Sequence, residues 1–525
     1  MRALHRAARA GCIAALAWGG LANGAGAETL ADAIALAYET NPTLQAERAQ
    51  VRIIDEEYPQ AQAGLRPTVS ADGGYSYQGE TISEPGTPNY SVTGGTTTAV
   101  VTITQPLYTG GLTAAHLDTA QADILAEREN LRHTEIGVLT SVVGAYLDVR
   151  RDAEQLAISQ DNVNVLARQL TETSAKFEAG TLTRTDLAQS QARLAQARSQ
   201  AAAAQATLAE ARAAYAAVVG QNPGELAPEP PIAPLLPPSV DAAFDAAERD
   251  NPQIRQADFV ERGAAARLAA AKSQTRPTAS LSAQYGYVGA QDAISGVSTG
   301  ASSGSPGGSS GLTSSSLGAL ETETGGSITA NVNIPIFTGG LTSSLIRQAA
   351  EQDNAARIGV EGARRQVLQA VAQAWNQLLG ARASLAADEE QVKSDTVAFE
   401  GVREEQKVGL RTVLDVLNAQ YELEQSQLAL VGARHDEYVA AAGVLAAMGA
   451  LEARNLVPDA PRYDPKVNFD KVRHAPGWVP WEKALDSLDR VGAPTTTPPP
   501  PPSEPGEVVR TGAPGAPDVG AQAPK

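Results

Sequence analysis

Apolar residues recur every seven positions through much of the first half of the chain. The first set is Leu117, Ile124, Leu131, Val138 and Ala145, and the second is Leu187, Leu194, Ala201, Leu208 and Tyr215. This spacing is typical of helices packed side by side. About 65 residues follow residue 112 before the turn without a proline, and at 1.5 Å per residue they predict a helix of roughly 100 Å. A coiled-coil stalk and a ring of helices both fit this pattern.

Other segments alternate polar and apolar residues, which predicts β-strands with one polar and one apolar face. Residues 68–77 alternate in this way, and residues 278–287 and 327–334 do the same. Strands of about ten residues with this alternation suit a membrane barrel with a wet interior. For any single strand, a half-buried sheet on a soluble core is the alternative. Four such strands with no other core for them to cover favour the barrel. Because about eight strands are needed to close a barrel, several chains must contribute to it.

These segments belong to an internal duplication. Asn41 and Pro42 recur as Asn251 and Pro252 at an offset of 210 residues, and from Pro106 to Gly220 the offset is 229. QPLYTGGL at 105–112 thereby matches IPIFTGGL at 334–341. The 19 extra residues of the second half fall in and around a Gly/Ser tract, where a surface loop is expected. Two repeats with one plan follow, each comprising a helix, a strand pair and a long helical hairpin.

The remaining segments complete the predicted domain organisation. An Arg-containing start, a short apolar core and an Ala-x-Ala spacing before Glu28 predict a secretory signal peptide. A Pro-rich tail from about residue 493 is expected to be disordered. The predicted parts are the signal peptide 1–27, the first repeat 28–221, a Pro-rich linker 222–239, the second repeat 240–451 and a C-terminal extension 452–525.

Composition and motifs exclude several classes of function. The net charge of −18 and the lack of basic clusters argue against nucleic acid as a partner. The single cysteine, Cys12, lies in the predicted signal peptide, and the five histidines show no metal-ligand spacing. No G-x-S-x-G, P-loop or H-E-x-x-H motif occurs, so we expect neither an enzyme nor a cofactor or metal site. No later run of about 18 apolar residues could form a membrane helix, so any span would consist of strands.

Together, these features resemble the TolC family of outer-membrane channel proteins over about residues 28–451. The most specific matches are PLYTGGL, PIFTGGL and the turn segments EAGTLTRTDLAQSQ and KVGLRTVLDVLNAQ. The resemblance implies an α+β membrane protein, a homotrimer whose twelve strands, four per chain, form one β-barrel in the outer membrane of a Gram-negative bacterium. A long periplasmic α-helical barrel would continue it. The implied partners are outer-membrane lipids, a periplasmic adaptor (membrane fusion protein) and an inner-membrane ABC or proton-driven transporter.

The resemblance also assigns roles to the two helical turns, which in that family are the periplasmic tips where the adaptor docks. The matching residues are Ala179, Gly180, Thr181 and Leu182 in one hairpin and Val408, Gly409 and Leu410 in the other. From the residues alone, the two glycines indicate only a tight helix reversal.

Family members close the tunnel just past the tips with charged and hydrogen-bonding residues. The matching positions are Thr185, Asp186, Arg411 and Asp415, together with Gln406 and Asn418, where some relatives carry a tyrosine and a second acid. Threefold symmetry would turn Asp415 into a ring of three carboxylates that favours cations and that a nearby Arg411 helps to hold shut. Because Asn418 and Gln406 replace the second acid and the tyrosine, we expect this chain to lack a second carboxylate ring and to close the tunnel less tightly. A solvated helix face is the alternative interpretation.

The two TGGL phrases are predicted to join a strand to a periplasmic helix. Pro106 and Pro335 would stop strand pairing because proline lacks an N–H. Gly110, Gly111, Gly339 and Gly340 would let the chain swing from the barrel wall to the tunnel wall. The flanking residues Tyr108 and Phe337 would lie at the level of the lipid headgroups, and Thr109 and Thr338 would cap the helices.

Two alternatives concern the function. A periplasmic adaptor would also carry a coiled-coil hairpin, but two hairpins, two strand pairs and no anchor argue against it. Within the channel interpretation, the stretch RYDPKVNFDKVR at 462–473 resembles a segment of channels for type I protein secretion, which favours protein export over multidrug efflux.

Overall fold

A computed structural model describes residues 27–83, 90–296, 319–457, 463–473, 479–491 and 493. The predicted signal peptide up to residue 26, residues 297–318 of the predicted surface loop and the predicted disordered tail beyond residue 493 lie outside the described residues.

The strands form one antiparallel sheet in chain order, as the strand pairs of the two repeats predict. The sheet consists of β1 (Thr68–Ile82), β2 (Tyr90–Tyr108), β3 (Thr278–Gly296) and β4 (Ala319–Asn333). Each strand has 15 or 19 residues, more than the predicted ten or so, because pairing continues beyond the clear alternation, for example from Gln78 to Ile82. The two repeats meet where β2 pairs with β3.

One face of the sheet carries an apolar row that crosses all four strands. Val69 pairs with Ile103, Ile103 pairs with Ala283, and Ala283 pairs with Ile328. Valine and isoleucine in this row are exposed in the single chain. Aromatic rings on the sheet also cover glycines: a Cβ added at Gly95 would lie 2.9 Å from the hydroxyl of Tyr75. The sheet surface therefore presents apolar and aromatic groups to its surroundings, as the alternation predicts.

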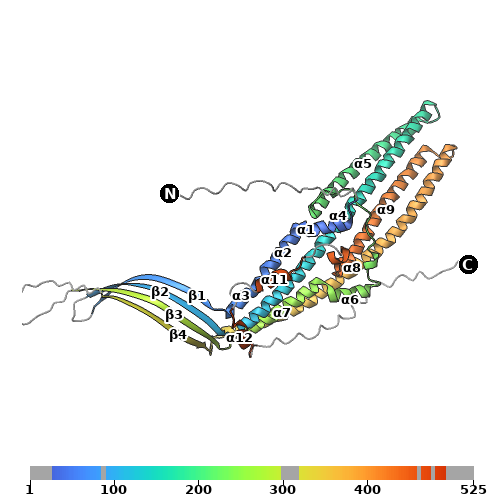
Figure 1. Cartoon of the computed structure of the whole chain (residues 1–525). Helices are drawn as coiled ribbons and strands as arrows, with labels where there is room; N and C mark the ends of the chain where they lie inside the picture. Colours follow the sequence, from blue (N-terminus) through green and yellow to red (C-terminus); the bar gives the residue numbers. More distant parts are fainter. Residues whose placement is uncertain are drawn as a thin grey trace, which may run out of the picture.

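Two long helical hairpins extend from one end of the sheet (Figure 1). They consist of α4 (Leu112–Glu178) with α5 (Arg184–Val219) and of α8 (Leu341–Lys407) with α9 (Val413–Ala447). Helices α4 and α8 have 67 residues each, which confirms the predicted length. All five residues of the first heptad set are buried on α4. The hairpin turns lie at the end of the molecule opposite the sheet.

Shorter helices pack along the hairpins between their middle and the sheet (Figure 1). They are α1 (Leu30–Thr40), α2 (Pro42–Asp55), α3 (Glu57–Gln62), η1 (Ala63–Leu65), η2 (Ala233–Leu235), α6 (Val240–Asp250) and α7 (Pro252–Ser273). The repeated Asn-Pro sequence has the same structural role in both repeats. Asn41 accepts a bond from the Thr43 N–H at 2.9 Å and donates to the Val218 carbonyl at 3.0 Å. Asn251 accepts from the Gln253 N–H and donates to the Ala447 carbonyl, both at 2.8 Å. Each asparagine thus starts a helix and ties it to the end of its own hairpin.

The main core lies where these helices meet the hairpins. Tyr146 and Tyr215 are fully buried there. The Tyr146 hydroxyl donates to the carbonyls of Glu28 and Ala227 at 3.0 and 2.7 Å, which joins the start of the first repeat to the Pro-rich connection. Buried hydroxyls need such partners. No helix in the described ranges is long and apolar enough to cross a membrane.

The C-terminal extension contains α10 (Ala453–Leu456), α11 (Lys466–Arg473) and α12 (Glu482–Asp489). Helix α11 packs on the first repeat, where the Phe469 ring contacts Tyr58 edge to face with centroids 5.3 Å apart. The Asn468 amide donates to Asp55 at 2.8 Å. The described part of the stretch that resembles secretion channels, residues 463–473, therefore packs on the first repeat through α2 and α3.

Candidate functional site

The two hairpin turns use the same backbone geometry. Gly180 and Gly409 have φ of +74° and +84°, and a Cβ at either would meet nothing within 4 Å. Glycine is therefore needed for the left-handed conformation and not for space. The Thr181 N–H donates to the Lys176 carbonyl and the Leu410 N–H to the Glu405 carbonyl, both at 2.9 Å, which closes each helix end.

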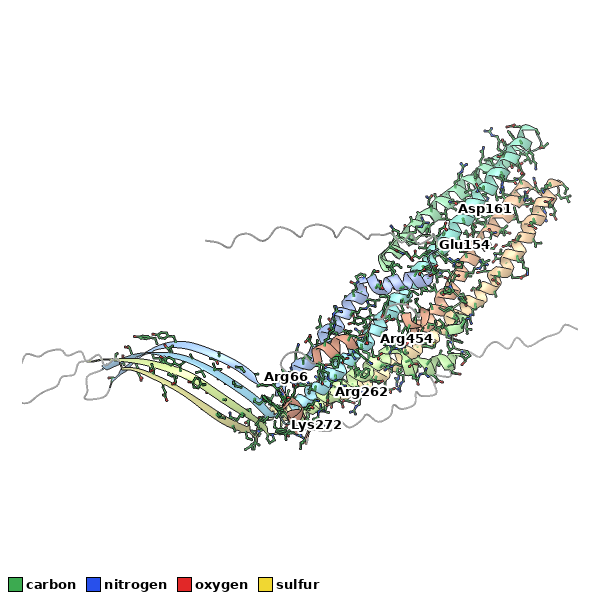
Figure 2. All side chains as sticks on the ribbon, viewed as in Figure 1. Arg66, Glu154, Asp161, Arg262, Lys272 and Arg454 are labelled. Carbon is green, nitrogen blue, oxygen red and sulfur yellow. The ribbon has the colours of Figure 1, made fainter. Side chains whose placement is uncertain are left out.

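The predicted tip residues lie in these turns. Ala179, Gly180, Thr181 and Leu182 connect α4 to α5, and Val408, Gly409 and Leu410 connect α8 to α9. Val408 and Leu410 are 73% and 76% exposed. Figure 2 shows Arg66 and Lys272 near the sheet, and Glu154 and Asp161 far along α4 toward the tip. The second tip thus carries two apolar side chains that the chain itself does not cover.

Both predicted aperture acids begin the returning helices as parts of capping boxes. The Thr183 hydroxyl accepts from the Asp186 N–H at 3.2 Å, and the Thr183 N–H donates to the Asp186 carboxylate at 3.0 Å. Thr412 and Asp415 make the same pair of bonds at 3.2 and 2.9 Å. Hydrogen bonds from the threonine hydroxyl and N–H lower the pKa of the Asp186 carboxyl. The Thr412 N–H, followed by its hydroxyl, lowers that of Asp415. Both carboxylates are held ionised.

Arg411 forms an ion pair across the turn. Its Nε atom lies 2.8 Å from the Glu405 carboxylate at the end of α8. The guanidinium also adds to the effect of the Thr412 hydrogen bonds in lowering the pKa of the Asp415 carboxyl. Thr185 is exposed on the first turn of α5, and Gln406 accepts the Gly409 N–H at 3.0 Å through its carbonyl.

Sequence reasoning missed the contact between the hairpins just past the tips. The Arg193 guanidinium on α5 donates to the Asn418 side-chain oxygen on α9 at 3.0 Å and lies 5.3 Å from the Tyr421 ring centroid. Asn418 stands out in the sequence only as a departure from relatives. A cross-hairpin partner that lies 225 positions away leaves no local signal.

Two buried polar residues, Gln420 and Glu424, follow Asn418 within the next two turns of α9. The Gln420 amide donates to the Asn162 oxygen on α4 at 3.2 Å. Glu424 is 2% exposed, and burial raises the pKa of its carboxyl. Its Oε1 atom has no hydrogen-bond partner in the described part of the chain. Leu166, Leu194, Ala197, Val413 and Leu417 form an apolar cluster beside this group.

At the other end, the TGGL phrases lie between strands and helices. Gly110 and Gly111 have φ of +74° and +86°, and Gly339 and Gly340 have φ of +63° and +86°. The Thr109 hydroxyl accepts the Thr113 N–H at 3.1 Å, and Thr338 does the same for Thr342 at 3.4 Å. Glycine therefore provides the left-handed turn into each helix, and the threonine satisfies an N–H of the first turn.

The prediction that Pro106 stops strand pairing is wrong. Pro106 pairs with Ser280 inside β2, and the register shifts between Pro106 and Tyr108. A bulge accommodates a residue without an N–H, so pairing continues past the proline. In the second repeat, β4 ends at Asn333, before Pro335.

Comparison with known proteins gives consistent matches. A family model described as outer membrane efflux protein matches residues 33–221 and 243–450. Outer membrane efflux protein BepC of Brucella suis biovar 1 is 36% identical over 448 residues, covering 85% of this chain and 91% of BepC. Outer membrane protein TolC of Vibrio cholerae is 25% identical over 84% of this chain and 95% of that protein. Alkaline protease secretion protein AprF of Pseudomonas aeruginosa is 25% identical over 64% of this chain and 66% of AprF.

Solved structures share the fold. The Campylobacter jejuni CmeC outer membrane channel superposes with a TM-score of 0.66 at 14% identity, covering 85% of this chain and 89% of CmeC. The matched proteins are outer-membrane channels and not enzymes. Because the family model spans most of the chain and BepC is similar over nearly its whole length, this chain belongs to the outer membrane efflux protein family, the family of the TolC channels that its sequence resembles.

Proposed function

We propose that this chain is the outer-membrane exit duct of a tripartite export system and that three copies form it. The observation that carries the proposal is a four-stranded sheet with an apolar face and two free outer edges, joined directly to hairpins of 67-residue helices. In the described sheet, β1 pairs only with β2 and β4 only with β3. Long unpaired edges tend to pair with another chain. Three copies joined edge to edge would supply twelve strands, enough to close a barrel.

The hairpin tips are the proposed docking surface for a periplasmic adaptor. The exposed Val408 and Leu410 support this role, because apolar side chains at the end of a long hairpin lose contact with water when a partner covers them. An inner-membrane ABC or proton-driven transporter would supply the energy.

Asp415 is the proposed selectivity residue of the periplasmic aperture. Arg411 on the same hairpin and Asp186 and Thr185 at the start of α5 are the other proposed aperture residues. The capping box of Asp415 holds the carboxylate in place and ionised, which supports a ring of three negative charges in a trimer. In planar bilayers, Asp415→Asn should reduce the preference for cations. Thr412→Ala is the control, because it removes the cap and leaves the carboxylate. Unchanged selectivity in Asp415→Asn would refute the ring.

Proteins and small molecules are both candidate cargo. Similarity to AprF, an alkaline protease secretion protein, supports protein secretion, and similarity to BepC, an outer membrane efflux protein, supports efflux. Deletion of the gene should therefore be followed by two measurements, the profile of secreted proteins and the susceptibility to drugs. A loss of secreted proteins alone would assign secretion, and drug sensitivity alone would assign efflux. Purification as a soluble monomer, in place of a detergent-dependent trimer from the outer membrane, would refute the duct itself.

A further inference from the structure

The last helix in the described residues, α12, lies on one of the two strand-to-helix joints. The family match ends at residue 450, so α12 lies beyond it. Helix α12 packs against β2, η1 and the start of α4. In Figure 1 it is found where the sheet meets the hairpins. The contact therefore joins the end of the described chain to a turn about 380 residues earlier.

Asp489 makes the central contact. It is fully buried, with 0% exposure. Its Oδ1 atom accepts the N–H groups of Thr109 at 2.7 Å and Gly111 at 3.2 Å, and its Oδ2 atom accepts the Ala114 N–H at 3.3 Å. The Thr109 hydroxyl also donates to the carboxylate, at 2.9 Å. A negative charge at this position satisfies free N–H groups and opposes the helix dipole of α4.

The other end of α12 contacts the neighbouring strands. The Arg66 guanidinium, just before β1, lies 3.2 Å from the buried Glu482 carboxylate. The Trp481 indole N–H donates to the Gln105 side chain in β2 at 3.1 Å. Helix α12 therefore connects the ends of two strands to the first turn of α4.

The second joint has no equivalent of this contact. Among the described residues, no carboxylate accepts a hydrogen bond from residues 338–344. Ile336 and Phe337 are 94% and 87% exposed, and a Cβ at Gly339 or Gly340 would meet nothing within 4 Å. The duplication repeated the joint, but the described part of the C-terminal extension covers only the first copy of it.

We propose that α12 is a clamp that fixes the direction in which the first hairpin leaves the sheet, with Asp489 as its positioning residue. Four hydrogen bonds to one carboxylate hold the left-handed Gly110–Gly111 turn, and the Arg66–Glu482 pair holds the same helix to the sheet. In a duct of three copies, clamped and unclamped joints would alternate around the ring. The clamp rests on contacts within one chain, so it does not depend on the cargo or on the proposed export function.

Hydrogen–deuterium exchange on the purified full-length protein tests the clamp, because the second joint is an internal reference. Asp489→Asn should speed exchange in the first joint and the first turn of α4, residues 109–115, on the order of tenfold or more, because the N–H groups of Thr109, Gly111 and Ala114 lose a charged acceptor and hydrogen bonds to charged groups are the strong ones. Exchange in the second joint and the start of α8, residues 338–344, should not change. Asp486→Asn makes the same chemical change one turn earlier on α12, at a carboxylate whose partner is Arg490 and not an N–H group of the joint. Arg490 keeps Asp118 of α4 as a second partner, so both turns should exchange as in the wild type.

Two results would overturn the clamp: unchanged exchange at the start of α4 in Asp489→Asn, or an equal increase at both helix starts. If Asp489→Asn does not fold, Glu482→Gln provides the same comparison, because it releases the other end of α12. A smaller increase in the exchange rate, confined to the start of α4, is then expected. An unchanged rate there, or an equal increase at the starts of α4 and α8, refutes the proposal.

Discussion

Glu424 offers a direct test of how the two hairpins are held together. Its carboxyl lies between α9 and the first hairpin, 2% exposed, with one oxygen unpartnered in the described structure. Glu424→Gln keeps the shape, removes the charge and adds an NH₂ donor near Asn162. Leaving a buried polar group unsatisfied costs about 1 to 3 kcal/mol, and more when it is charged. We therefore expect the substitution to raise the free energy of unfolding by about 1 to 3 kcal/mol per chain at pH 8.

The pH dependence of this gain follows from the direction of the pKa shift. Burial raises the pKa of Glu424 in the folded protein above its ordinary value. The wild type is therefore most stable, with respect to this group, below the pKa of the unfolded chain, and loses that stability as pH rises through the folded pKa. The advantage of glutamine is full at pH 8 and disappears as pH falls toward 4.

Urea denaturation of the purified protein, followed by circular dichroism at pH 8 and pH 4, measures both quantities. Glu422→Gln is the matched control, because Glu422 is exposed on the same helix two residues earlier and its substitution should change little at either pH. A destabilised Glu424→Gln at pH 8 would show that the carboxylate is satisfied by a partner in the assembled protein. A gain of equal size at both pH values would show that the charge is not its cause.

Two further predictions concern single side chains. Gly110 and Gly180 share a φ of +74°, but a Cβ at Gly110 would lie 2.9 Å from the Arg276 Cβ and one at Gly180 would meet nothing. Gly180→Ala should lower the free energy of unfolding by roughly 1 to 2 kcal/mol through backbone strain alone. Gly110→Ala should lower it by clearly more and should reduce the yield of trimer on native gels, because the added Cβ also clashes. Equal trimer yields for the two variants would contradict the packing argument. Tyr146→Phe leaves the Glu28 and Ala227 carbonyls without their shared donor and should lower the free energy of unfolding by about 1 to 3 kcal/mol. Faster protease cleavage near residue 227 measures this loss. An unchanged cleavage rate would mean that other groups replace the hydroxyl.

The hairpins could be predicted from the sequence because their signal is local and periodic. The heptad residues from Leu117 to Ala145 are all buried, and the absence of proline set the length of α4 and α8 correctly. The duplication also made each element of one repeat evidence for its counterpart, so the strand pairs were recovered from modest alternation. Strand length was underestimated because pairing within the sheet stabilises residues such as Gly79 and Glu80, whose own pattern is irregular.

The contacts that distinguish the two repeats could not be predicted, and the reason is physical. Arg193 with Asn418 and Asp489 with Thr109 are pairings of single polar residues hundreds of positions apart. The burial of Glu424 likewise depends on a hairpin that lies far away in the sequence. Such contacts leave no periodic pattern in the sequence, because they depend on how helices and strands pack together after they have formed. The T-x-x-D boxes at Thr183 and Thr412 did carry a readable local signal. These capping boxes show that Asp186 and Asp415 stabilise the starts of α5 and α9, independently of any role in transport. A substitution at either aspartate therefore changes both the start of a helix and the charge at the proposed aperture, which is why the selectivity test needs Thr412→Ala, where the cap is lost and the charge remains.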